Sequence, residues 1–163
     1  AKALTNGAIP MGGVAVTDEI YNTVTDAAPD DAIEFFHGYT YSAHPAACAA
    51  GIATQKIYQS EGLFERAAAL EDYFLDAIWT LQDHPLVTDV RGIGLMAGVE
   101  LVSDGVAGHR GVQMQKAMFW NGLHVKFTGD NAIIAPAFVA ERKHVDEIVD
   151  KFRSSLDAAL EAK

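Results

Sequence analysis

A lysine followed by a glycine-containing loop stands at the start of this sequence. Residues 2–12 read KALTNGAIPMG, so that Lys2 is followed by small and flexible residues. A lysine amine attacks an aldehyde only when it is neutral, and burial or a nearby cation lowers its pKa toward that state. One interpretation of Lys2 is therefore a nucleophile that forms a Schiff base. The other is an exposed lysine near a chain end that does no chemistry.

A run of hydroxyl-bearing residues precedes a predicted helix. Residues 37–45 read HGYTYSAHP, in which Pro45 suits the first turn of a helix and Ser42 is a candidate cap. A helix N-terminus presents free backbone N–H groups and a partial positive charge, which together favour a phosphate. The segment predicts either a phosphate-binding loop or a helix start that binds nothing.

Few elements are available in the first sixty residues to position these two segments. The sequence predicts a strand over residues 13–16, a short helix that begins at residues 17–19 and ends before Pro29, and a helix over residues 45–59. One strand and a few helices cannot close a hydrophobic core. We therefore expect residues 1–61 to be the tail of a larger α/β domain, and the chain to be part of a longer protein.

Residues 62–163 carry enough elements for a small α+β domain. Apolar residues recur at steps of three and four over residues 63–81, and a second such stripe lies at the C-terminal end, which predicts two amphipathic helices. The pattern between them predicts a helix over residues 111–120 and strands over residues 87–90, 94–101, 123–127 and 132–135. Gly129 and Asp130 separate the last two strands and predict a hairpin turn. The change of composition near residues 60–62 places the domain boundary there.

The composition argues against several classes of partner. The formal net charge is −10, and such an acidic surface repels nucleic acid and anionic lipid. Cys48 is the only cysteine, which fits a protein of the reducing cytoplasm. His37 and His44 lack the spacing and the carboxylate or thiolate company of metal ligands, so we expect no metal. No apolar stretch is long enough to suggest a membrane partner.

Three segments in register resemble the class III aminotransferases, the omega-amino acid:pyruvate family of pyridoxal-phosphate enzymes. Residues 2–12 are similar to the stretch that follows the Schiff-base lysine of that family, and residues 37–45 to its phosphate-contacting loop. Residues 90–98, VRGIGLMAG, are similar to a stretch of the family's small domain. The resemblance covers essentially the whole chain.

The resemblance implies the C-terminal part of the type I fold of pyridoxal-phosphate enzymes, an α/β fold. Residues 1–61 would be the tail of the large cofactor-binding domain, and residues 62–163 the small C-terminal domain. Lys2 would carry pyridoxal 5'-phosphate and move the substrate proton. Thr40 would donate a hydrogen bond to the phosphate of the other subunit's cofactor, with Tyr39 in the same loop. The enzyme would be a homodimer with both chains in each active site.

The sequence departs from the family pattern at the substrate carboxylate. Relatives that use pyruvate carry an arginine in the strand before a Gly-Asp pair, whereas residues 125–130 read VKFTGD and place Lys126 there. Lysine is a point-charge donor that cannot make the planar two-bond contact of arginine. Lys126 is thus either a weaker substrate-binding residue or a solvated lysine of the strand.

The implied reaction is a transamination from an ω-amino acid or amine to a 2-oxo acid, most often pyruvate. Its partners would be these small-molecule substrates and a missing N-terminal half, which in this family supplies the aspartate at the pyridine nitrogen, a ring-stacking aromatic and a glycine-rich loop. The same cofactor chemistry also serves decarboxylases and aminomutases. A further alternative is that the chain is a truncated, non-catalytic module for dimerisation or binding.

Overall fold

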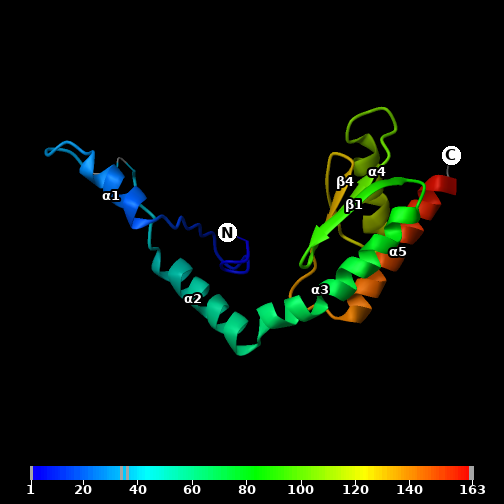
Figure 1. Ribbon diagram of the computed structural model, residues 1–163, viewed down its shortest axis with the longest axis horizontal. Coiled ribbons are helices and arrows are strands. Elements are labelled where there is room, and N and C mark those ends of the chain that lie inside the picture. Colours follow the sequence, from blue (N-terminus) through cyan, green and yellow to red (C-terminus); the bar gives the residue numbers. More distant parts are fainter. Residues whose placement is uncertain (1, 34, 36, 162–163) are drawn as a thin grey trace. The chain divides into compact units, whose positions relative to one another are not determined.

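The chain folds into two compact units, residues 1–61 and residues 62–163. The computed structural model describes residues 2–33, 35 and 37–161. The first unit is coloured blue to teal in Figure 1 and the second green to red. Over the described residues, the helices are all too short or too polar to cross a membrane.

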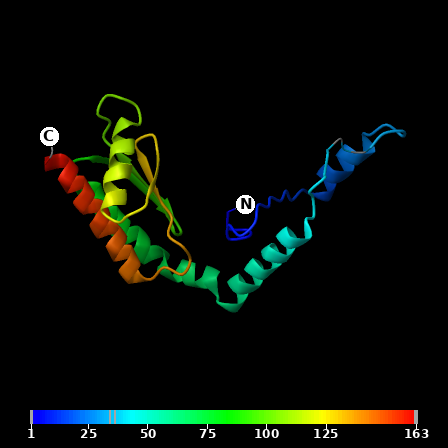
Figure 2. The same ribbon diagram turned by 180° about the vertical axis from the view of Figure 1, so that it is seen from behind.

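The first unit is built from two helices joined by long loops (Figure 2). Helix α1 (Asp18–Asp26) begins after Thr17, whose hydroxyl accepts a hydrogen bond from the Ile20 N–H. Helix α2 (Pro45–Ser60) begins with proline, as the sequence predicts. The N-cap of α2 is His44, without a side-chain bond, so the expectation that Ser42 caps the helix is wrong. A cap must directly precede the first helical residue, and Ser42 lies too early in the preceding turn.

The expectation of a strand over residues 13–16 is also wrong. The backbone forms no strand there, and Val14 and Val16 are exposed. A strand is stabilised by hydrogen bonds to a neighbouring strand, and the described part of this unit offers none to pair with. α1 buries no residue at all. The first unit therefore holds together mainly through the contacts of α2 with the loop before α1.

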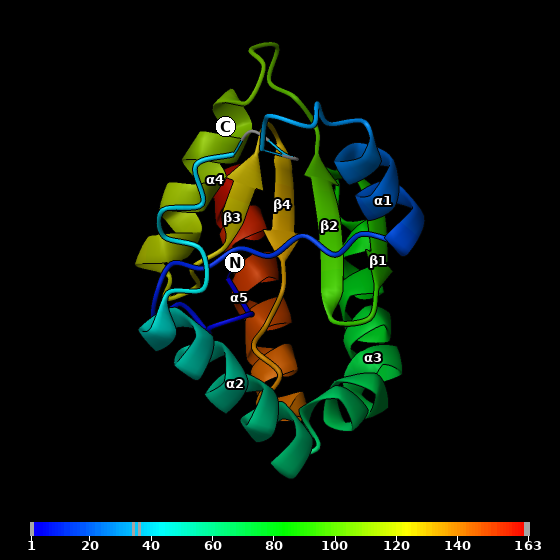
Figure 3. The ribbon, with the colours of Figure 1, turned by 90° about the vertical axis from the view of Figure 1, so that its left-hand side faces the viewer.

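The second unit is an antiparallel sheet with helices on one face (Figure 3). The sheet has the order β1-β2-β4-β3. Its strands are β1 (Val87–Ile93), β2 (Met96–Leu101), β3 (Lys126–Thr128) and β4 (Asn131–Ile134). The helices are α3 (Leu63–Trp79), which continues into the 3-10 turn η1 (Thr80–Asp83), α4 (His109–Trp120) and α5 (Arg142–Glu161). The expected elements are therefore present, with bounds that shift by a few residues.

The hydrophobic core lies between the sheet and the helices. Phe74 of α3, Met118 of α4 and Phe152 of α5 are fully buried against it. Val99 and Ala132 are likewise fully buried and come from adjacent strands. All residues of this buried cluster belong to the second unit. Within residues 62–161 no element covers the opposite face of the sheet, which we call the open face.

Candidate functional site

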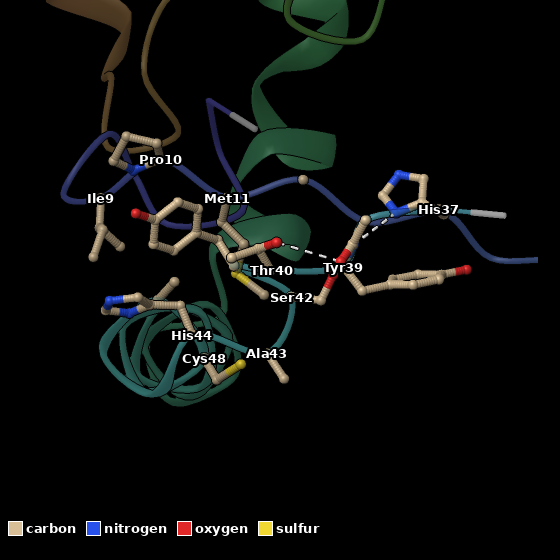
Figure 4. A pocket seen from close by; sticks show the side chains of 14 residues that line it. Ile9, Pro10, Met11, His37, Tyr39, Thr40, Ser42, Ala43, His44 and Cys48 are labelled. Atoms are coloured by element: carbon tan, nitrogen blue, oxygen red, sulfur yellow. Dashed lines mark hydrogen bonds between the residues drawn. The ribbon is translucent and has the colours of Figure 1, made fainter.

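A cavity of about 670 Å³ lies in the first unit between the loop before α2 and residues 9–12. Figure 4 shows the side chains around it, among them Thr40, Ser42 and His44. None of the residues that the structure places around this cavity carries an acidic group. Hydroxyl groups without a neighbouring carboxylate suit an anionic ligand, because the anion meets donors and no like charge.

Thr40 is exposed at this cavity and its hydroxyl is weakly engaged. Its Oγ1 donates to the carbonyl of Gly38 at 3.3 Å, a long contact for a hydroxyl donor. A ligand oxygen at a shorter distance can replace that acceptor. The hydroxyl that the sequence singles out is therefore free to turn toward a phosphate.

Tyr39 gives the loop its shape. Its backbone has φ +49°, in the left-handed region, and its N–H donates to Nδ1 of His37 at 3.1 Å. The rings of the two residues lie 4.3 Å apart, centroid to centroid. A non-glycine residue in that conformation is uncommon and is often found at binding sites. The His37 contact explains how this conformation is maintained.

Lys2 lies exposed at the other segment that the sequence singles out. Its carbonyl accepts from the Gly7 N–H at 3.0 Å in a turn. The Tyr58 hydroxyl, on α2, donates to the carbonyl of Ala3 at 2.7 Å. The buried Thr5 donates to the carbonyl of Ile9 at 2.6 Å and closes the loop on itself. Sequence reasoning missed Tyr58, because a bond to a residue 55 positions away leaves no periodic signal, and it missed Thr5, whose bond lies in a loop without a repeating pattern.

The structure does not bring Lys2 and Thr40 together. Lys2 lies beside Ala3, which contacts Tyr58 in the last turns of α2, whereas Thr40 precedes Pro45 at its first turn. Pro45 and Tyr58 are about 20 Å apart along the helix axis, at 1.5 Å for each residue. The loop of Lys2 also reaches the middle of α2, where the Leu4 carbonyl lies 3.8 Å from the position of a Cβ at Gly51, and Lys2 does not line the cavity at Thr40.

Lys126 lies on the open face of the sheet in the second unit. It is exposed, and its neighbour Phe127 packs on the core from the other face. Across the sheet it is aligned with Ile133, Gly98 and Arg91. Within the described residues its amine makes no hydrogen bond or ion pair that would neutralise it. Lys126 is thus available to an anion.

Arg91, at the far end of the same row, is neutralised by its neighbours. Its Nη1 lies 2.5 Å from Asp89 Oδ2 and 3.2 Å from Glu100 Oε2. The hydrogen bond to Asp89, followed by that to Glu100, raises the pKa of the Arg91 guanidinium above its ordinary value. Arg91 therefore joins two strands, as a structural hydrogen-bonding residue does, whereas Lys126 has no carboxylate partner among the described residues.

The imidazole, thiol and carboxylate side chains of the described part of the chain are dispersed. No group of three or more His, Cys, Asp or Glu side chains lies together there. The residues that the sequence singles out lie at a hydroxyl-lined cavity, on a loop that carries Lys2, and on the open face of the sheet.

The known proteins that this chain resembles are aminotransferases. The family of class-III aminotransferases matches residues 1–156. An omega-aminotransferase of Caulobacter vibrioides is 46% identical over 157 residues, which cover 96% of this chain and 36% of that protein. A beta-alanine–pyruvate aminotransferase of Pseudomonas aeruginosa is 38% identical over 159 residues, again 96% of this chain and 36% of the relative. The chain thus spans about a third of the length of these relatives.

The solved structures agree with the sequence relatives. The omega transaminase of Pseudomonas jessenii in complex with PMP superposes with a TM-score of 0.71 and 32% identity over 76% of this chain and 29% of that one. This likeness and the family match confirm the expected fold class, the C-terminal part of the type I fold. The chain belongs to the class-III aminotransferase family.

Proposed function

We propose that the full-length protein is a pyridoxal-phosphate-dependent transaminase. It moves an amino group from an ω-amino acid or amine to a 2-oxo acid, with pyruvate as the acceptor. Family membership supports the reaction class, and the relative from Pseudomonas aeruginosa, named for beta-alanine and pyruvate, supports the substrate pair. The single observation that carries the proposal for this chain is the acid-free cavity of the family's phosphate loop, with its hydroxyl groups exposed.

The cavity in the first unit fits the phosphate of the cofactor. Thr40 offers a hydroxyl whose present acceptor is distant, and the N-terminus of α2 lies directly behind the loop. Tyr39 lies in the same loop and lines the cavity beside it. When bound, pyridoxal phosphate supplies an electron sink for the carbanion that forms at the substrate carbon. The role of Thr40 and Tyr39 is to bind and orient its phosphate end.

Lys2 is the residue that we propose to hold the carbonyl carbon of the cofactor through its Nζ. Once the substrate amine had displaced it, the Lys2 amine would move the proton between the substrate carbon and the cofactor. An amine does this only in its neutral form, and Lys2 is exposed in the chain described here. The remainder of the enzyme must therefore cover Lys2 and exclude water from it.

The separation of Lys2 from Thr40 supports a homodimer with shared active sites. Lys2 is not among the residues that line the cavity at Thr40, so one chain need not bring both residues to the same cofactor. Each chain would then supply Lys2 to one site and Thr40 to the other. The exposed apolar side chains of the first unit agree with such an assembly; Val14 and Tyr41, for example, are 92% and 84% exposed.

Lys126 is proposed to bind the substrate carboxylate. It is unpaired among the described residues and projects from a sheet face that no element of its own unit covers. A single ammonium provides a weaker and less directional contact than the arginine of related enzymes. In this proposal residues 1–61 are the tail of the cofactor-binding domain, and residues 62–163 are the small domain that presents Lys126.

Borohydride reduction of the full-length holoenzyme tests the role of Lys2. The cofactor should remain covalently attached to the peptide that contains Lys2, and Lys2→Ala should abolish transamination while the fold persists. Lys56 lies exposed on α2 and is the matched lysine, whose Ala variant should remain active. A label on Lys56 or Lys126 would overturn the assignment.

A product assay tests the acceptor. Pyruvate should be converted to alanine in step with loss of the amino donor. Loss of carbon dioxide from the donor without formation of alanine would instead indicate a decarboxylase.

A further inference from the structure

The β-hairpin that carries Lys126 is attached to the N-terminus of α4 by one carboxylate. Oδ1 of Asp130 accepts from the Gly111 N–H at 2.9 Å, and Oδ2 accepts from the Gly108 N–H at 3.3 Å. The carbonyl of Asp130 also accepts from the Leu101 N–H at 2.9 Å, at the end of β2. We call the two carboxylate contacts the Asp130 cap. The negative charge suits this position, because a helix N-terminus is partially positive.

The hairpin turn and the first turn of α4 pack with no space between them. A Cβ added at Gly111 would lie 1.9 Å from the carbonyl oxygen of Gly129. A Cβ at Gly108 would lie 3.4 Å from the Gly129 Cα. Two glycines on the helix side therefore permit the backbone approach that the Asp130 cap requires.

Val125, directly before Lys126, is buried in the core, but after the lysine the strand has little besides the hairpin turn to fix its position. β3 has three residues, lies at the edge of the sheet and pairs only with β4. Its one residue directed at the core, Phe127, is only partly buried. A short edge strand is weakly constrained, so the place of Lys126 depends on the turn that follows it as well as on Val125.

We infer that Asp130 is a positioning residue that fixes Lys126 for the substrate carboxylate. The inference rests on the proposed role of Lys126. An ammonium on a four-carbon stem already has conformational freedom, and further motion of its strand would lower the fraction of time spent near the substrate. Asp130 removes that motion by joining the hairpin to α4, without touching the substrate itself.

Asp130→Asn in the full-length holoenzyme tests this inference. Asparagine keeps the shape of the side chain but loses the charge and one of the two acceptors. The KM for the oxo acid should rise about three- to tenfold, as the loss of a modest contact predicts. The KM and kcat for a primary amine donor without a carboxylate should stay within about twofold in assays at saturating oxo acid.

Asp104→Asn is the matched control. Asp104 lies in the loop before α4, and accepts from the Val106 N–H at 3.3 Å and contacts His109 Nδ1 at 2.7 Å, but it has no bond to the hairpin. This variant should leave the KM for the oxo acid unchanged. Melting curves of both variants show that the comparison is made between folded proteins.

Lys126→Ala completes a double-mutant cycle. In its background Asp130→Asn should have no further effect on the KM for the oxo acid, because the residue to be positioned is gone. If Asp130→Asn still raises that KM, Asp130 acts independently of Lys126 and the inference fails. If Lys126→Ala raises the KM while Asp130→Asn alone does not, the inference again fails, but the proposed role of Lys126 stands. If Lys126→Ala changes nothing, the role of Lys126 is refuted and the inference with it.

Discussion

Gly111 lies in the first turn of α4, where alanine would ordinarily stabilise a helix. Replacing a helical glycine by alanine gains about 1 kcal/mol when the site is unobstructed. Here the added Cβ would lie 1.9 Å from the Gly129 carbonyl oxygen, a backbone atom that cannot rotate away. The turn and the helix would have to separate by about 1 Å or more to restore an ordinary contact. We therefore expect Gly111→Ala to destabilise the protein.

The size of the effect follows from two losses. Overpacking costs about 1–3 kcal/mol, and lengthening the bond from Gly111 to the charged carboxylate of Asp130 costs about 1.5–3 kcal/mol. After the gain in helix propensity, the free energy of unfolding should fall by about 2–5 kcal/mol. This is a large part of the stability of a domain of this size.

Urea denaturation of residues 62–163, followed by circular dichroism, measures this change. The fragment is suitable because every residue of the buried core cluster lies within it. Val112→Ala is the matched control: Val112 is adjacent, on the same helix, and 52% exposed, so its replacement should change the stability by less than about 0.5 kcal/mol. A Gly111→Ala fragment more stable than the wild type would show that the turn does not pack on α4 as described.

Three further outcomes are expected. Thr40→Ala should raise the dissociation constant of the cofactor about ten- to a hundredfold, through loss of a hydrogen bond to a charged phosphate, and an unchanged constant in a spectroscopic titration would contradict the phosphate role. Lys126→Arg should lower the KM for the oxo acid and leave simple amines unaffected, since a two-bond contact becomes possible; equal effects on both would show that residue 126 does not face the substrate. The hydrogen bond from Lys151 lowers the pKa of Glu147, so this carboxylate stabilises the fold above its ordinary pKa and ceases to do so as the pH falls through the lowered value. Glu147→Gln should then be less stable than the wild type at neutral pH and equal to it in acid, as denaturation at the two pH values would show.

The sequence predicted those features of the fold that depend on local pattern. The apolar steps of residues 63–81 predicted α3 because a helix repeats its environment every three to four residues. β2 begins at Met96 rather than at the expected residue 94, because Gly94 takes φ +56° in the turn before the strand. The prediction of a strand over residues 13–16 is wrong because the sequence of a segment does not show whether a neighbouring strand is available to pair with it.

The candidate site was predictable only in part. Lys2, Tyr39, Thr40 and Lys126 came from motifs, and their roles remain proposals. The Asp130 cap could not have been found, since sequence reasoning saw Asp130 only as a turn residue. Its partners lie about twenty positions earlier. They are backbone N–H groups, which nearly every residue type has, so no sequence motif marks them.

The placement of Lys2 outside the cavity that Thr40 lines has a genetic consequence. If each chain gives these residues to different sites, then a hybrid of one Lys2→Ala subunit and one Thr40→Ala subunit has one doubly defective site and one intact site. Two alleles that are each inactive at low cofactor concentration would then complement one another in the same cell. Mixing the two purified variants should then restore activity only as fast as their subunits exchange.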